Sequence, residues 1–171
     1  GYHGAIYIIG DRFSGKTFFT HYAINKYLPN SPVYKISPSP EGSVSLKNFR
    51  TKFAQAFDEK GSYEEKISKA KKGSVIILDE FELWWERSTD GFTVADELIR
   101  IINEYGSRYL FVINMNSYAY GILNSVRNFE SYALNVIHCG PFKAEQLKEA
   151  VLLRHNAGGM KLEYKGTVQE K

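Results

Sequence analysis

The chain has 171 residues, enough for one domain with its own hydrophobic core, and its 43% hydrophobic and 24% charged content is ordinary for a globular protein. No apolar run approaches the ~18 residues of a membrane span, and the net charge of +3 is too small to indicate nucleic-acid binding, which is possible but unsupported. The single cysteine excludes an internal disulfide and fits a reducing compartment, so we expect a cytoplasmic location.

Five short apolar segments alternate with segments of helical period along the chain. We expect strands at residues 5–9, 33–37, 74–78, 109–115 and 134–139. Three of these segments are nearly continuous in apolar residues, which is typical of parallel strands covered by helices on both faces. Strands that alternate with helices predict right-handed βαβ units and therefore one three-layer α/β domain.

The segments between the strands carry helix signals. A helix is expected over residues 18–27, and Ser62 and Glu65 form a capping-box pattern that begins a short helix. Thr93 is the expected N-cap of another helix, and a last one is expected after Pro141. A further amphipathic helix is indicated by apolar side chains at helical spacing, namely Leu46, Phe49, Phe53, Ala54 and Phe57.

The first strand runs directly into the sequence GDRFSGKT, which fits the phosphate-loop pattern G-x-x-x-x-G-K-[ST] between a strand and a helix. Two glycines allow a tight turn and a close approach of the main chain to a phosphate, while N–H groups bind its oxygens. Lys16 is expected to reach the β- and γ-phosphates, and Thr17 to give its hydroxyl to Mg²⁺. The predicted nucleotide-binding residues are Gly10, Asp11, Arg12, Phe13, Ser14, Gly15, Lys16, Thr17 and Phe18.

The strand at 74–78 brings two acidic residues to the same edge of the sheet. Asp79 is expected to hold Mg²⁺ together with Thr17. Glu80 is expected to orient and deprotonate the water that attacks the γ-phosphate. An acidic helix N-terminus after a strand is the alternative interpretation, and the phosphate loop earlier in the chain favours the nucleotide site.

A polar residue at the end of the next strand could contact the γ-phosphate or the attacking water. In the sequence FVINMNS, Asn116 lies nearest the expected strand end, and Asn114 is the competing choice. An asparagine that only caps the strand or the following helix is the alternative role.

These motifs together resemble the ATPase core of AAA+ proteins and of the related STAND-type NTPases. GDRFSGKT looks like a Walker A motif, VIILDE like a Walker B motif with a catalytic glutamate, and Asn116 like a sensor-1 residue. The resemblance implies a five-stranded parallel sheet in the order 5-1-4-3-2, with ATP and Mg²⁺ as cofactors. It also implies a P-loop NTPase core over residues 1–140 and the start of a C-terminal lid or extension over 141–171. Because both ends of the sequence look cut, we expect the chain to be a fragment of a longer protein.

The resemblance also bears on the arginines. Arg127 sits where these ATPases carry an arginine finger that completes a neighbour's site, and a solvated arginine on a surface helix is the alternative. Arg154 is expected to pack its stem or pair with a carboxylate rather than act as a sensor-2 residue. We expect contacts with a second copy or a partner protein at the nucleotide edge.

The adjacent tryptophans 84 and 85 follow the acidic pair. We expect one indole in the core and the other beside the site or at an interface, in preference to a loop that grips a polymer.

The sequence leaves three candidate functions. The first is Mg²⁺-dependent ATP hydrolysis that drives conformational change or assembly, and Glu80 favours it. The second is a nucleotide-gated switch with little turnover. The third is a small-molecule kinase, which the absence of an arginine-rich acceptor lid disfavours.

Overall fold

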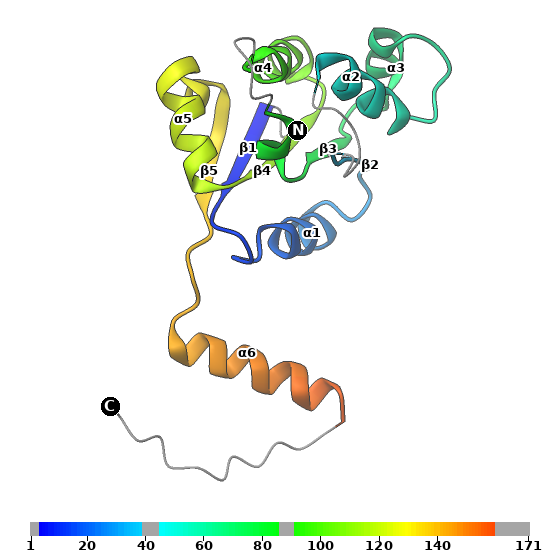
Figure 1. The fold of residues 1–171 in the computed structure, drawn as a ribbon. Coiled ribbons are helices and arrows are strands. Elements are labelled where there is room, and N and C mark those ends of the chain that lie inside the picture. The colour runs from blue at the N-terminus through cyan, green and yellow to red at the C-terminus, as the bar shows by residue number, and fades with distance from the viewer. Residues whose placement is uncertain (1–3, 39–44, 86–90, 160–171) are drawn as a thin grey trace, which may run out of the picture. The chain divides into compact units, whose positions relative to one another are not determined.

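The computed structural model describes residues 4–38, 45–85 and 91–159 (Figure 1). The chain divides into two compact units, Gly1–Cys139 and Gly140–Lys171, and the second contains the helix α6 (Ala144–Ala157). That the second unit acts as a lid stays a prediction. Among the described residues no helix combines the length and the apolar character that crossing a bilayer requires.

The first unit is built on a sheet of five parallel strands. The strands are β1 (Gly4–Ile9), β2 (Val33–Ile36), β3 (Val75–Leu78), β4 (Leu110–Met115) and β5 (Ala133–His138). Their order across the sheet is β2-β3-β4-β1-β5, which is the predicted order 5-1-4-3-2 read from the other edge. The central strands β3 and β4 are buried along their whole length, as their continuous apolar sequences predict.

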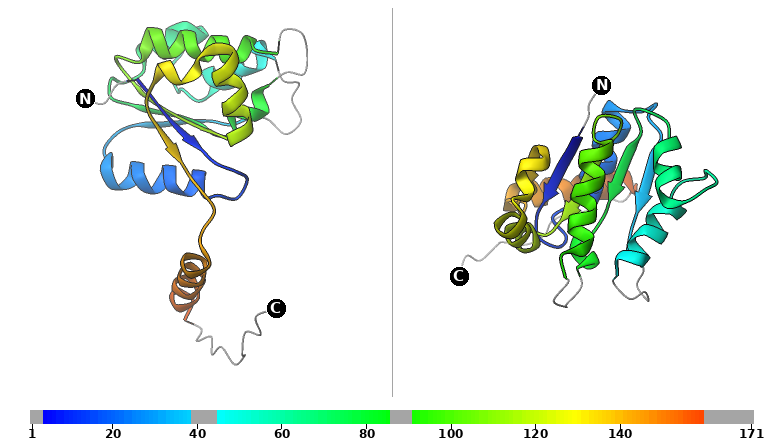
Figure 2. Two further views of the ribbon diagram at one scale, coloured as in Figure 1. Left: turned by 90° about the vertical axis from the view of Figure 1, so that its left-hand side faces the viewer. Right: turned by 90° about the horizontal axis from the view of Figure 1, so that it is seen from above.

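Helices cover both faces of this sheet, which confirms the three-layer α/β architecture (Figure 2). Among the described residues of the first unit, one face carries the helix α1 (Lys16–Tyr27), whose Ile24 packs on a cluster that includes Ile8 and Val112. The other face carries four helices around the larger, aromatic-rich core cluster. They are α2 (Leu46–Gln55), α3 (Tyr63–Lys69), α4 (Thr93–Tyr105) and α5 (Ser117–Arg127).

Of two helix starts predicted from local sequence signals, one is confirmed and one is wrong. The capping box of Ser62 and Glu65 forms as predicted, with reciprocal bonds of 2.9 and 3.4 Å. The predicted N-cap at Thr93 is wrong, because Phe92 holds that position and Thr93 is the first helical residue. The ring of Phe92 packs against Trp85 with centroids 5.1 Å apart, so tertiary packing fixes this helix start instead of a side-chain cap.

A buried carboxylate joins α2 to α4. The side chain of Glu97 is only 5% exposed and lies 3.0 Å from the guanidinium of Arg50 and 3.0 Å from that of Arg100. Burial by itself would raise the pKa of Glu97, but the hydrogen bonds from Arg100 and Arg50 outweigh it and lower the pKa from 4.5 to about 2. The contact therefore stabilises the fold only while Glu97 is ionised.

We expect the substitution Glu97→Gln to lower the free energy of unfolding at neutral pH by roughly 1–3 kcal/mol, because hydrogen bonds to a charged acceptor are lost. Since the pKa is lower in the folded chain than in the unfolded one, this contribution is complete above pH 4.5 and disappears as the pH falls towards 2. Urea unfolding of both chains across this pH range measures the difference.

The matched control is Glu104→Gln, which removes an exposed partner of the same Arg100 at 2.6 Å. It should cost no more than about 0.5 kcal/mol. If the unfolding free energies of the wild type and Glu97→Gln fall in parallel from neutral pH to pH 2, the stabilising role of Glu97 is refuted.

Candidate nucleotide-binding site

The predicted site residues gather where the parallel strands end. The turn at residues 10–15 joins the end of β1 to the start of α1, and Asp79 follows the last residue of β3 (Figure 1). In the sheet register, Ile9 lies opposite Met115 and Leu78 opposite Ile113, so the ends of β1, β3 and β4 are level. Ligands of open parallel sheets bind at this edge.

Two glycines shape the turn for different physical reasons. A Cβ on Gly10 would lie 2.4 Å from the carbonyl oxygen of Cys139 and 2.5 Å from Oγ of Ser14, so no side chain fits there. Gly15 has open space around it, but its φ of +85° lies in the left-handed region that favours glycine. Both glycines thus lie where a side chain is disfavoured, whereas the predicted close approach of the main chain to a phosphate stays a prediction.

The side chain of Lys16 bonds back to the main chain of the loop that precedes it. Nζ of Lys16 donates to the carbonyl oxygens of Gly10 at 2.8 Å and Asp11 at 2.9 Å, and the side chain is almost fully buried. Oγ of Ser14 is also buried, and among the described residues it has no hydrogen-bond partner. A buried hydroxyl without a partner is unusual and fits a site that a polar ligand completes.

The other predicted loop residues point into solvent. Asp11, Arg12 and Phe18 are exposed, and Phe13 is fully so. Phe13 also has a φ of +64°, which is rare for a bulky side chain and costs about 1 kcal/mol or more. The predicted contact of these residues with a nucleotide stays a prediction.

The carboxylate of Asp79 is the point where three elements of the site meet. Its Oδ1 accepts from the hydroxyl of Thr17 and from the amide of Asn114, both at 3.0 Å. Its Oδ2 lies 3.2 Å from the same hydroxyl and 3.3 Å from Nζ of Lys35. Burial alone would raise the pKa of Asp79, but the hydrogen bonds from Asn114, Thr17 and Lys35 outweigh it and the pKa is lowered.

Asn114 links this carboxylate to α1. It is fully buried on β4, and its Oδ1 lies 2.9 Å from the hydroxyl of Thr20. That hydroxyl is also 2.9 Å from the carbonyl oxygen of Lys16, one turn earlier in the helix. The chain of bonds from Asp79 through Asn114 to Thr20 therefore fixes the start of α1 against the ends of β3 and β4.

Asn116, unlike Asn114, lies at the start of the helix α5 (Ser117–Arg127). It is the N-cap of α5, where its Oδ1 accepts from the N–H of Ala119 at 2.7 Å. Its own N–H donates to the carboxylate of Glu82 at 3.3 Å. The structure thus joins Asn114 to Asp79 and uses Asn116 as a helix cap, and the sensor role of Asn116 stays a prediction.

Glu80 lies beside the Asp79 cluster and is exposed. Its φ of 50° and ψ of 48° are left-handed, an unfavourable conformation for a residue other than glycine. This turn lets the chain leave β3 and begin the 3-10 helix η1 (Phe81–Trp84) at once. A strained residue at the end of a site-forming strand is typical of functional positions.

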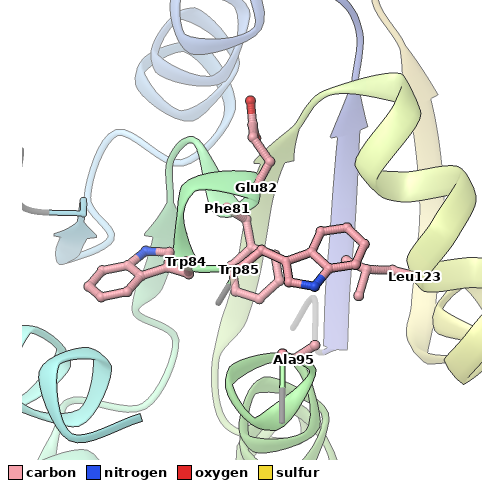
Figure 3. A pocket seen from close by; sticks show the side chains of 7 residues that line it. Phe81, Glu82, Trp84, Trp85, Ala95 and Leu123 are labelled. Carbon is pink, nitrogen blue, oxygen red and sulfur yellow. The ribbon is translucent and has the colours of Figure 1, made fainter. Parts of the chain in front are cut away.

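The tryptophans follow in η1. Trp84 is 2% exposed and meets the ring of Phe49 edge-on at 5.3 Å, so the prediction of one indole in the core is confirmed. Trp85 is half-buried against the core. Figure 3 shows both indoles lining a small pocket with Phe81, while Glu82 points away from the rings.

Arg127 does not belong to the Asp79 cluster. Its guanidinium makes two bonds of 2.6 and 3.2 Å to the carboxylate of Asp96 and lies 5.0 Å above the ring of Phe92. Arg127 is thus held at the start of α4 within its own chain. Arg154 is exposed on α6.

Lys35 is the residue that sequence reasoning missed. It interrupts the apolar strand β2, and a lysine inside a short strand is the only local signal of its role. Nothing in the sequence VYKIS indicates that its ammonium reaches a carboxylate on the neighbouring strand.

The site fits Mg²⁺ and a nucleotide. Mg²⁺ prefers hard oxygen ligands and is usually held by one or two protein groups together with substrate phosphates, and the hydroxyl of Thr17 beside the carboxylate of Asp79 is such a pair. Across residues 4–38, 45–85 and 91–159 there is no group of three or more His, Cys, Asp or Glu side chains that could hold a metal.

Comparisons with known proteins agree on the fold. No family model and no curated protein sequence matches the chain. Among solved structures, the Aeropyrum pernix ORC1 protein in complex with DNA is 17% identical with a TM-score of 0.63, over 90% of this chain and 44% of that one. Cdc6p from Pyrobaculum aerophilum is 16% identical with a TM-score of 0.64, over 90% and 43%.

The Aeropyrum pernix ORC2 protein, in its ADPNP–ADP complexes, is 13% identical with a TM-score of 0.63, over 90% of this chain and 46% of that one. This chain therefore spans less than half the length of the solved chains that it matches. At such low identity the likeness shows the fold alone, an α/β domain with a five-stranded parallel sheet, and membership of the AAA+ or STAND group stays a prediction.

We expect Gly10→Ala to disrupt the loop, because the added methyl group would meet a main-chain carbonyl oxygen. The thermal midpoint should fall, by an amount corresponding to roughly 1–3 kcal/mol for an overpacked site. Nucleotide binding, measured by isothermal titration calorimetry, should fall below detection.

Gly121→Ala is the matched control, because a Cβ at this position in α5 meets nothing within 4 Å. It should raise stability by up to about 1 kcal/mol, as alanine does in helices, and leave nucleotide binding unchanged. Equal behaviour of the two variants would contradict the close-approach role of Gly10.

Proposed function

We propose that this chain is the core of an ATPase that binds ATP with Mg²⁺ at the turn between β1 and α1. The observation that carries the proposal is the meeting of Thr17 and Asp79, 62 residues apart in the sequence, at 3.0 Å. In a phosphate loop that binds Mg²⁺ with a nucleotide, the Ser or Thr of the loop and the Asp at the strand end lie side by side. A chance match to the sequence pattern would not bring these two residues together.

Nucleotide binding is proposed as an exchange of partners at the loop. The ammonium of Lys16, now bonded to two carbonyl oxygens of the loop, would turn to phosphate oxygens. Main-chain N–H groups of residues 10–18 and the start of α1 would complete the cradle, since a helix N-terminus attracts anions. The buried hydroxyl of Ser14 would gain a partner in the same step.

Thr17 and Asp79 would hold Mg²⁺, which when bound supplies positive charge against the phosphates. Asp79 is prepared for this role because its lowered pKa keeps it ionised well below neutral pH. Asn114 acts as a positioning residue, since its Nδ2 donates to Oδ1 of Asp79 and its Oδ1 accepts from the hydroxyl of Thr20.

Glu80 is proposed as the general base. It is exposed at the edge of the site and directly follows Asp79, so its carboxylate is free to approach a water molecule next to bound phosphate. Asn116 is proposed to contact that water or the γ-phosphate.

A switch with little turnover is the second candidate, and one observation favours it. Arg127 is bound to Asp96 in its own chain, so in a lone copy it would not add its cation to those of Lys16 and Mg²⁺ at the charge that develops in the transition state. In the proposed ATPase this cation comes from a neighbouring copy or a partner protein at the nucleotide edge. Such a partner and a cytoplasmic location stay proposals.

We expect Glu80→Gln to lower the rate of phosphate release from ATP by at least about 100-fold while ATP still binds, because only proton transfer is lost. Lys16→Ala should abolish ATP binding itself. Phosphate release and calorimetric ATP binding, measured on both variants, separate the two roles.

The control for charge is Glu59→Gln, an exposed carboxylate beyond the end of α2, which should leave both measurements unchanged. ATP binding without turnover in the wild type at every protein concentration would favour the switch. A normal rate in Glu80→Gln would remove that residue from its role.

We expect the rate per molecule to rise with protein concentration in the wild type and to stay flat in Arg127→Ala, because the finger acts between copies. Arg108→Ala, at the amino end of β4, is the control and should behave as the wild type. A concentration-dependent rate that survives in Arg127→Ala would exclude Arg127 as the finger.

A further inference from the structure

Lys35 adds a positive charge to the Asp79 cluster from the edge of the sheet. Its Nζ lies 3.3 Å from Oδ2 of Asp79. The Lys35 side chain is 42% exposed, whereas that of Asp79 is 11% exposed. The carboxylate is therefore held in place, while the ammonium can exchange its contact for water.

The fold places this ammonium on the same side of the sheet as Thr17. Lys35 pairs with Ile77 in the parallel register of β2 and β3, so both side chains share one face. Ile77 belongs to the core cluster that includes Ile24 of α1, and Thr17 lies in the first turn of that helix. Lys35 and Thr17 thus approach the carboxylate of Asp79 from one side.

Of the three donors at Asp79, Lys35 alone carries a charge. Thr17 and Asn114 are neutral donors, so they can keep their bonds when a cation lies nearby. An ammonium and a divalent cation beside the same carboxylate repel each other. The ammonium of Lys35 and the divalent cation would both use Oδ2 of Asp79, because Asn114 bonds only to Oδ1.

We propose that Lys35 neutralises Asp79 while no Mg²⁺ is bound and gives up this contact when Mg²⁺ arrives with a nucleotide. Lys35 is then a positioning residue that sets the Mg²⁺ concentration needed for nucleotide binding. The inference rests on the proposed nucleotide site and assigns Lys35 no contact with the phosphates.

The test measures Mg²⁺ dependence of binding, apart from turnover. A fluorescent ADP analogue is held at fixed concentration, MgCl₂ is titrated, and fluorescence polarisation reports the bound fraction. Lys35→Met should lower the Mg²⁺ concentration at half-saturation by roughly three- to tenfold, since repulsion at this solvent-facing contact is modest. Lys35→Arg keeps the charge and should stay near the wild type.

Lys72→Met makes the same change in net charge near the amino end of β3, away from Asp79, and should leave half-saturation unchanged. In EDTA, the analogue should bind Lys35→Met no more tightly than the wild type, because the carboxylate of Asp79 then lacks its ammonium partner and repels phosphate. A second readout uses no ligand: Lys35→Met should lower the thermal midpoint in the wild-type background more than in an Asp79→Asn background.

The outcomes separate the inference from the proposed function. A wild-type chain that binds no analogue at any Mg²⁺ concentration overturns both. Binding with the same half-saturation in Lys35→Met and the wild type overturns the inference alone. Tighter binding of Lys35→Met in EDTA overturns it as well, because the effect of the substitution would then not depend on Mg²⁺.

Discussion

The site depends on one carboxylate that is mostly removed from water and kept ionised. Taking Asp79 out of solvent is unfavourable, and the fold offsets this cost with donors from three different elements. Thr17 comes from α1, Asn114 from β4 and Lys35 from β2, while Asp79 itself follows β3. Because each donor belongs to a different element, the charge can be stabilised only when the strand order is correct.

The same bonds explain why the start of α1 has a fixed position. The turn before α1 is strained at Phe13 and left-handed at Gly15, so the local sequence alone would not hold it. Thr17 and Thr20 tie the first two turns of the helix to Asp79 and Asn114 at the edge of the sheet. The geometry of the loop is thus supported by residues far away in the sequence.

Much of the fold could be predicted from sequence, for identifiable reasons. The strands were predicted from apolar runs, and the capping box of Ser62 from a local pattern that its own side chains satisfy. The strand order came from a family resemblance, because periodicity alone does not say which strands are neighbours. The helix start at Phe92 was missed because packing against Trp85, not a cap, determines it.

The candidate site, like the fold, could be predicted from the sequence only in part. The pairing of Thr17 with Asp79 follows from two motifs, whereas the roles of Asn114 and Lys35 depend on which way side chains point from a strand. Two asparagines in the sequence NMN are both polar and both near the strand end. The burial of Asn114 and the capping bond of Asn116 distinguish them. The capping bond is local, whereas the burial of Asn114 is a tertiary property that the sequence does not give.

The two lysines of the site share one physical feature, since each is satisfied by the protein itself. Lys16 is bonded to carbonyl oxygens of its own loop, and Lys35 to the carboxylate of Asp79. A ligand that binds Lys16 must first break the hydrogen bonds that Lys16 makes with the loop. The net free energy of binding is therefore smaller than the contacts with phosphate alone suggest. A ligand that brings several negative charges together with a cation can replace all of these bonds at once, and the proposed nucleotide with Mg²⁺ is such a ligand.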